Sequence, residues 1–252
     1  WEWNGTRWTL VSNSGPAANS WAPMAYDRRR QRMVLVTQES NVMRTWEWDG
    51  ANWTLRSAGD FSPRSFAAMA YDPVRGECIL HGGFGVQPGG GLGTFDETWA
   101  WNGSSWSQRA VMGPGARAGH SMTWDSWRGE IVLLGGNGAT PDPDGYFTDC
   151  WTWNGSAWTL DAATRPGKRE TCIAAFDPVR GTTVVAAGTY VSGGFTRIPA
   201  DTWVRGPSGP TVDAIATLDA VCPGAPVSIP VTAYGSEPLS FQLPAINLRF
   251  MR

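Results

Sequence analysis

The sequence has little of what many metal-dependent, catalytic and membrane proteins need. It holds only two histidines, His81 and His120, and four cysteines, none of them in a CxxC pair, so a zinc site is poorly supplied. The longest apolar runs, such as residues 131–134, fall far short of the ~20 residues that cross a bilayer. No nucleophile–base motif and no phosphate-binding loop is present. The sequence therefore predicts no membrane span, and it assigns no catalytic or cofactor-binding residue.

Charge is also scarce and nearly balanced. The chain has 20 Lys+Arg and 22 Asp+Glu, a formal net charge of -2, and only 17% charged residues. The basic run at residues 28–32 is short, and we interpret it as a solvated turn. A near-neutral chain without an extended basic patch lacks the electrostatic footprint of a nucleic-acid-binding protein.

Tryptophan, by contrast, is abundant and periodic. The octet Trp-x-Trp-[Asn/Asp]-Gly-x-x-Trp begins at Trp1, Trp46, Trp99 and Trp151, with successive spacings of 45, 53 and 52 residues, and a remnant ends at Trp203. The four octets hold 12 of the 16 tryptophans. A fixed period near 50 residues is typical of a repeat architecture.

Each octet predicts a β-hairpin. Asn-Gly and Asp-Gly favour a two-residue type I′ turn, because both central residues need positive φ. With residues 4–5 as the turn, Trp1 would face Trp8 and Glu2 would face Arg7 across the strands. We expect the tryptophans to form the core between neighbouring repeats.

A second block before each later hairpin predicts two more strands. It reads APMAYD, AAMAYD, HSMTWD and CIAAFD, followed by a turn and a nearly continuous apolar strand. Gly76, Gly129 and Gly181 suit a left-handed position in the turn, whereas Gln31 breaks the pattern. Because a strand that is apolar throughout is covered on both faces, each repeat is a four-stranded sheet that needs neighbours.

The repeats predict an all-β protein with a β-propeller of about five four-stranded blades. We expect the propeller at residues 1–205, a linker at 206–210 and a short β-segment at 211–252, with repeat hairpins at 1–12, 43–57, 95–109, 148–160 and 200–204. The first blade is incomplete, because the first repeat supplies only one hairpin. The chain begins inside a repeat, so we expect it to be a processed product or part of a longer chain.

The repeats resemble those of the bacterial extracellular kelch-type propellers. Gly82-Gly83 and Gly135-Gly136 end a strand as the kelch double glycine does, and a tryptophan follows on the next strand. The resemblance covers roughly residues 1–205, and the first repeat departs from it, with Thr37-Gln38 in place of the glycines. It implies the fold and says little about function, because kelch-type propellers include binding modules, scaffolds and some enzymes.

Residues 211–252 resemble the opening of an immunoglobulin-like domain. Alternating apolar residues at 227–233 and a second run at 239–243 predict two strands. Such a domain needs roughly 100 residues, so the segment is either truncated or donates strands. We expect the first hairpin to be completed by strand addition, either from this tail or from a neighbouring copy.

Two groups of residues are candidates for structural or metal sites. Cys150 takes a threonine position of the other repeats and Cys172 takes the position of His120, so neighbouring blades would bring them within reach of a disulfide. Weak candidates for calcium ligands are Asp142, Asp144 and Asp149, which a turn-rich insertion explains equally well.

Other recurring or exposed residues are candidates for contact with a partner or ligand. Trp21 and Trp127 lie outside the octets and are the best candidates for exposed contact with a partner. Arginines and acids recur at fixed repeat positions, and we interpret them as pairs between strands or blades rather than as a ligand-binding ring; they are Arg64, Arg117, Arg169, Glu97, Asp149 and Asp201.

These observations favour a non-catalytic extracellular or cell-surface module that binds protein or glycan. One alternative is a structural subunit of a surface filament or assembly, completed by strand addition between copies. Another is a secreted oxidase or glycan-active enzyme. Copper-radical oxidases share the kelch-type fold, but His81 and His120 fall in different repeats, and we interpret both as structural.

Overall fold

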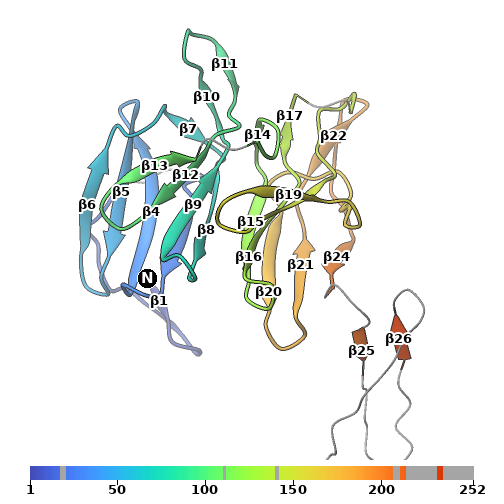
Figure 1. Cartoon of the computed structure of the whole chain (residues 1–252). Helices are drawn as coiled ribbons and strands as arrows, with labels where there is room; N and C mark the ends of the chain where they lie inside the picture. Colours follow the sequence, from blue (N-terminus) through green and yellow to red (C-terminus); the bar gives the residue numbers. More distant parts are fainter. Residues whose placement is uncertain (18–20, 110–111, 140–141, 207–210, 214–231, 235–252) are drawn as a thin grey trace, which may run out of the picture. The chain divides into compact units, whose positions relative to one another are not determined.

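The computed structural model describes residues 1–17, 21–109, 112–139, 142–206, 211–213 and 232–234. Within them the fold is all-β, without helices, and consists of many antiparallel sheets (Figure 1). No helix in this part of the chain is long and apolar enough to cross a bilayer. The chain divides into two units, Trp1–Arg205 and Gly206–Arg252. The all-β class expected from the repeats is confirmed.

Three repeats form complete four-stranded sheets, each with its strands in chain order. The second sheet contains β3 (Met24–Asp27), β4 (Arg32–Glu39), β5 (Val42–Trp48) and β6 (Trp53–Ala58). The third contains β8 (Ala68–Asp72), β9 (Glu77–His81), β12 (Thr98–Trp101) and β13 (Trp106–Arg109). The fourth contains β15 (Ser121–Asp125), β16 (Glu130–Leu134), β18 (Cys150–Trp153) and β19 (Trp158–Asp161).

The first and last repeats are incomplete. The first hairpin consists of β1 (Glu2–Trp3) and β2 (Trp8–Thr9), which pair only with each other among the described residues. The fifth sheet has three strands, β20 (Ile173–Asp177), β21 (Thr182–Ala186) and β24 (Thr202–Arg205). The innermost strands β3, β8, β15 and β20 neighbour one another in that order, and no closed ring of sheets is detected in the described part of the chain.

The connections between the second and third strands of three sheets contain short strands: β10 (Phe84–Val86) and β11 (Leu92–Thr94), β17 (Asn137–Gly138), and β22 (Tyr190–Ser192) with β23 (Phe195–Arg197). Two further short strands, β7 (Arg64–Ser65) and β14 (Arg117–Ala118), precede the first strands of the third and fourth sheets and pair with β10 and β17, respectively. In the second sheet, β4 and β5 are instead joined by a tight turn in which Ser40 and Asn41 have positive φ. The long connections therefore belong to the third, fourth and fifth sheets.

Octet tryptophans join consecutive sheets, as expected. Trp106 Nε1 donates to Thr45 Oγ1 at 2.8 Å, and Trp101 Nε1 donates to Glu47 Oε1 at 3.1 Å, so both indoles of the third sheet bond the second. Trp101 is fully buried. Burying an indole removes a large apolar area from water and contributes several kcal/mol at ~25 cal/mol/Å².

The repeat also shows where a substitution removes an acceptor. Trp153 corresponds to Trp101, but Ala100 takes the place that Glu47 has in the preceding sheet, and the buried Trp153 Nε1 has no hydrogen-bond partner among the described residues. Trp46 Nε1 is likewise unpaired, because Arg44 occupies the position of Glu97. Each unpaired donor costs stability relative to its satisfied counterpart.

The expected two-residue hairpin turn is wrong. The strands pair Trp3 with Trp8, so the loop is the four-residue stretch 4–7, and the other octets have the same register. Asn4 Oδ1 accepts hydrogen bonds from the backbone N–H of Thr6 and Arg7, both at 3.0 Å. This side-chain cap stabilises a longer loop, and it moves the aromatic pair from Trp1–Trp8 to Trp3–Trp8 and removes the expected Glu2–Arg7 pairing.

The glycine positions of the inner hairpin are explained by backbone conformation and crowding. Gly76, Gly129 and Gly181 have φ of 74°, 69° and 66°, and Gln31 adopts the same left-handed conformation at 54°. In the double glycine, Gly83 N–H donates to the carbonyl of Arg117 in the next repeat, and a Cβ on Gly82 would lie 2.4 Å from that oxygen. Only glycine permits this approach.

In the C-terminal unit, β25 (Thr211–Asp213) pairs with β26 (Thr232–Tyr234). The expected strand at 239–243, most of that at 227–233, and Cys222 lie outside the described residues. The immunoglobulin-like start and the strand addition therefore stay predictions.

Candidate binding site at the inner mouth

At one end of the inner strands, each of four repeats has a residue with a left-handed backbone conformation. Trp21, Phe66, Gly119 and Thr171 occupy the same repeat position and have φ of 64°, 60°, 66° and 53°. Gly119 N–H donates to Phe66 O at 2.9 Å, and Thr171 N–H donates to Gly119 O at 2.7 Å, so the backbone forms a continuous arc across three repeats. We call this arc the mouth. A left-handed β-branched residue such as Thr171 is uncommon, and strained backbone of this kind is frequent at functional sites.

The long connections lie at the same end of the sheets as the mouth. Figure 1 shows β10, β11, β14, β17 and β22 together at one end of the sheets that carry them. Binding residues are often found on loops that a rigid scaffold positions, which makes this end the candidate functional face.

Two adjoining depressions open at the mouth. The first, the Glu170 pocket, has a volume of about 230 Å³ and is lined by Phe66, Phe84, Ala118, Gly119, Asn137 and Glu170. The second, the His120 pocket, has a volume of about 220 Å³ and includes Trp21, Phe66, Gly119, His120, Thr171 and Cys172. Phe66 and Gly119 line both. The Trp21 and Phe66 rings are stacked with centroids 5.0 Å apart, which forms an aromatic ledge beside the pockets.

Glu170 is the acid of this site, and hydrogen bonds hold both its backbone and its carboxylate in place. Its backbone exchanges two hydrogen bonds with Thr189, and its carboxylate accepts from Asn137 Nδ2 at 2.6 Å and from the Tyr146 hydroxyl at 3.4 Å. The Tyr146 oxygen in turn accepts from the backbone N–H of Val191 at 2.9 Å. Burial raises the pKa of Glu170 above its ordinary value.

The three acids that recur at one repeat position are paired with cations. The recurring arginines and acids form the pairs Arg64–Glu97 at 2.6 Å, Arg117–Asp149 at 2.7 Å and Arg169–Asp201 at 2.8 Å. Each acid also accepts from the first octet tryptophan of its own sheet, Trp99, Trp151 or Trp203. The arginine side chains are fully buried, so these groups are structural pairs within a repeat and do not form an open ligand ring.

The weak calcium candidates do not form a cluster in the described part of the chain. Lys168 Nζ lies 2.7 Å from Asp142 Oδ2 and 2.9 Å from Asp144 Oδ2, so an ammonium already neutralises both carboxylates. Asp149 is bound by Arg117 instead. No group of three or more His, Cys, Asp or Glu side chains within the described ranges is placed to hold a metal ion.

The two histidines are buried, although His120 also lines the second pocket. The His81 and His120 rings meet edge to face with centroids 5.5 Å apart, and His81 Nδ1 shares a hydrogen bond with Thr98 Oγ1 at 3.0 Å. Burial, together with nearby arginines, lowers the pKa of His81 to about 3; burial and His81 lower the pKa of His120 well below its ordinary value. Both imidazoles are therefore neutral at pH 7.

The expected disulfide is not formed. Cys150 and Cys172 are free thiols that lie in one buried cluster with Val132, Leu134 and Val185. Burial raises the pKa of Cys150 to about 12 and also raises that of Cys172. In this environment both behave as small apolar side chains.

Trp21 and Trp127, the two tryptophans that the sequence singles out for contact with a partner, are exposed. Trp21 is 57% exposed at the mouth, and Trp127 is 58% exposed in the turn between β15 and β16, at the other end of the sheet. Trp127 Nε1 donates to Pro178 O at 2.9 Å, and the indole covers Gly181 in the next inner turn. Trp21 is thus part of the candidate site, whereas Trp127 packs over the neighbouring turn.

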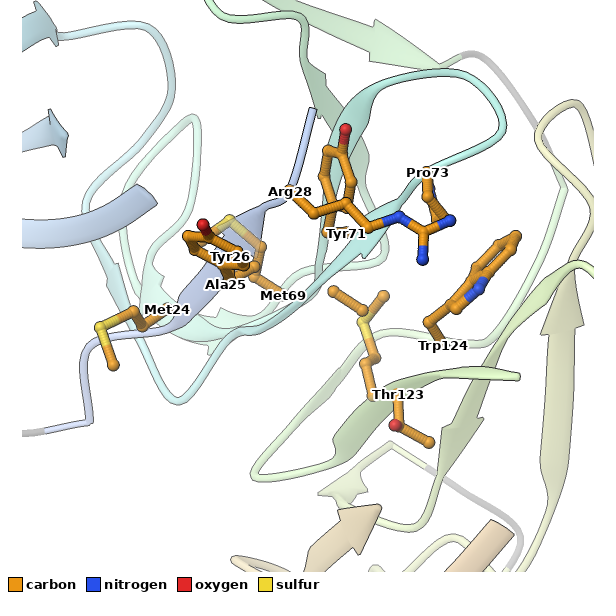
Figure 2. A pocket seen from close by; sticks show the side chains of 11 residues that line it. Met24, Ala25, Tyr26, Arg28, Met69, Tyr71, Pro73, Thr123 and Trp124 are labelled. Carbon is orange, nitrogen blue, oxygen red and sulfur yellow. The ribbon is translucent and has the colours of Figure 1, made fainter. Parts of the chain in front are cut away.

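A larger depression of about 320 Å³ lies along the inner strands β3, β8 and β15 (Figure 2). Met24 and Tyr26 line it and are 53% and 51% exposed, whereas Met69 and Tyr71 at the same repeat positions are buried against the second sheet. Among the described residues no inner strand of the first repeat covers β3, which leaves Met24 and Tyr26 exposed beside this hollow. It therefore has a structural cause and is a weaker site than the mouth.

Sequence reasoning missed Glu170, Phe66, Phe84, Asn137 and Tyr146. One signal was present: after the recurring arginine, the other repeats have the small residues Ser65 and Ala118, whereas the last has Glu170. A charged residue at a position that is otherwise small marks a departure from the structural repeat.

Comparisons with known proteins support the fold class. No protein-family model matches the chain, and no curated protein sequence matches it. Among solved structures, the chain is similar to YjhT, a kelch-like propeller protein, with a TM-score of 0.59 and 16% identity. The match covers 71% of this chain and 61% of YjhT, so the chain spans about three fifths of that protein's length. At this identity the likeness shows an all-β, propeller-like fold and carries no information on catalysis.

Proposed function

We propose that this chain is a kelch-like propeller of about five blades that acts as a non-catalytic interaction module, binding a protein or glycan at the mouth. The observation that carries the proposal is the stacked Trp21–Phe66 ledge beside the Glu170 pocket. Apolar walls with a few convergent polar groups are the usual composition of a binding site. The strained arc beneath them rests on rigid strands.

The chemistry of the mouth favours binding over catalysis. Glu170 is the one carboxylate that lines either pocket, and the one imidazole that lines either pocket, that of His120, is only 6% exposed. A glycosidase of the usual kind needs two carboxyl groups flanking the bond. The resemblance of the repeats to bacterial extracellular kelch-type proteins supports an extracellular or cell-surface setting, and the immunoglobulin-like start at 211–252 belongs to the same proposal.

The proposal is tested by an array of glycans and by cross-linking to candidate surface proteins. Phe66→Ala and Trp21→Ala should abolish whatever binding the unmodified chain shows, because both remove the ledge. Trp127→Ala is the matched control, since it removes an equally exposed indole at the other end of a sheet. Binding that survives both mouth variants, or that only Trp127→Ala removes, would place the site elsewhere.

A second candidate function is assembly with other copies. In the first hairpin Trp1, Trp3 and Trp8 are 71%, 51% and 63% exposed, whereas their counterparts in the third and fourth sheets are largely buried. A hairpin with unpaired edges can pair with a strand of another chain, and its exposed aromatic face can pack against another protein surface. Sedimentation of the wild-type chain and of a Trp3→Ser/Trp8→Ser variant tests it: assembly predicts concentration-dependent oligomers that the variant loses.

A further inference from the structure

We propose that the Glu170 pocket binds a cationic group, the ammonium of lysine or the guanidinium of arginine, presented by a protein partner. This inference rests on the proposed function and names the chemistry of its ligand. It is carried by three features of the site: an acid without a cation, aromatic walls, and a combination of groups that the chain completes elsewhere.

The first feature is the charge of Glu170. In the described part of the chain its carboxylate contacts only the neutral donors Asn137 and Tyr146. By contrast Glu97, Asp149 and Asp201 each pair with an arginine, and Asp142 and Asp144 share Lys168. A partly buried carboxylate without a counter-charge is costly, and a bound cation would recover that cost.

The second feature is the wall around this acid. Phe66 and Phe84 line the same pocket as Glu170, and Phe84 is 40% exposed, so its ring is open to a ligand. The face of a phenyl ring attracts a cation electrostatically, more strongly when water is excluded. A neutral sugar would gain the apolar contact but not the attraction to the carboxylate.

The third feature is internal precedent. Arg64 lies over the Phe95 ring, with Cζ 3.6 Å from its centroid, and pairs with Glu97. Arg117 lies over Phe147 at 3.7 Å and pairs with Asp149. The chain thus builds phenylalanine and carboxylate around a guanidinium twice. The Glu170 pocket has the phenylalanines and the carboxylate without the cation.

The test uses small probes of defined charge. N-acetyl-lysine amide and N-acetyl-arginine amide are titrated into the whole chain, with N-acetyl-norleucine amide as the uncharged isostere of lysine. The backbone amide of Gly119 and the side-chain amide of Asn137 report binding by NMR. We expect a saturable shift with at least one cationic probe and an affinity about tenfold lower, near 1.4 kcal/mol, for norleucine.

Variants separate the carboxylate from general surface charge. Glu170→Gln keeps the size of the side chain and should lower the affinity for the cationic probe about tenfold. Phe84→Ala should lower that affinity to a similar extent. Asp96→Asn removes an exposed charge outside the pocket and should leave the affinity unchanged. Thermal unfolding of each variant confirms that it is folded.

The outcomes distinguish this inference from the function on which it rests. No saturable shift with either cationic probe, equal binding of norleucine, or unchanged binding by Glu170→Gln would overturn the cation site. If a neutral glycan binds in a Phe66-dependent way at the same time, the interaction module stands with a different ligand. If no cationic probe, glycan or protein partner binds in a way that Phe66→Ala weakens, both proposals fail.

Discussion

The indole Nε1 of Trp158 donates a hydrogen bond to Thr98 Oγ1 at 2.9 Å, although the two residues lie on different sheets, 60 positions apart in the chain. The same hydroxyl shares a hydrogen bond with His81 Nδ1. One threonine therefore connects the third and fourth sheets and also orients a buried imidazole.

Replacing this threonine tests how much the contact between sheets contributes. We expect Thr98→Val to lower the free energy of unfolding by about 1–3 kcal/mol, because it leaves a buried indole N–H and an imidazole nitrogen unpaired. Urea unfolding measures the change. Thr54→Val, on the exposed surface of β6, is the control and should change stability little. Equal stability of Thr98→Val and wild type would show that the indole finds another acceptor.

A second prediction concerns the buried Arg117–Asp149 pair. Asp149→Asn leaves the fully buried Arg117 guanidinium without its counter-charge, and we expect a loss of about 3–5 kcal/mol by urea unfolding. Asp201→Asn is the comparison, because Asp201 is 49% exposed and water can solvate the change, so its loss should be smaller.

The same pair predicts a pH dependence. Although burial by itself raises the pKa of Asp149, the hydrogen bonds and charge of Arg117 outweigh it and hold that pKa below the ordinary 3.8. A lowered folded pKa contributes stability that is present above 3.8 and is lost as pH falls through the folded value. The stability gap between wild type and Asp149→Asn should thus be constant near neutrality and narrow only below about pH 4. A gap that narrows already between pH 7 and pH 5 would contradict this assignment.

The histidine pair predicts a separate loss of stability at mildly acid pH. Because the folded protein holds both imidazoles neutral, the unfolded chain takes up protons first as pH falls below 6.5. Unfolding free energy should then fall by up to about 1.4 kcal/mol per pH unit for each histidine. His120→Phe should reduce this slope between pH 6.5 and pH 4.5, above the range in which Asp149 acts. An unchanged slope would mean that His120 is protonated in the folded state.

The thiols of the core should resist modification. Cys78, Cys150 and Cys172 are buried free thiols, and burial raises the pKa of each. In a Cys222→Ala background we expect no reaction with an aromatic disulfide reagent at pH 8 until denaturant is added, because the thiolate is the reactive form. Three thiols should then titrate. Rapid reaction of the folded chain, or a Cys150–Cys172 cross-link found by mass spectrometry, would contradict the free-thiol structure.

Much of the fold could be predicted because its signals are local and repeated. The apolar strand before Gly82 and the glycines at 76, 129 and 181 depend on strand burial and backbone φ, which neighbouring residues largely decide. The hairpin register failed because Asn4 uses its side chain to bond two backbone amides, and turn statistics for Asn-Gly do not include that competing cap.

Apart from the departure at Glu170, the repeat gave no sign of the candidate site, because its members come from different repeats and from the long connections. Glu170 precedes β20, Phe84 begins β10, and Asn137 lies in β17. These residues come together only because consecutive sheets pack against each other, and residue spacing along the chain does not predict that packing. For the same reason the acids at 142 and 144 suggested calcium until the structure placed Lys168 between them.

By itself, the sequence determined the all-β class, the repeated antiparallel sheets and the tryptophan contacts between them, because period, alternation and glycine position act within a single repeat. Only the tertiary structure decided which of the carboxylates have a cationic partner, because pairing depends on distances between side chains that are far apart in the sequence. Among the described residues it places an arginine on Asp149 and none on Glu170, and the proposed cation site rests on that difference between the two carboxylates.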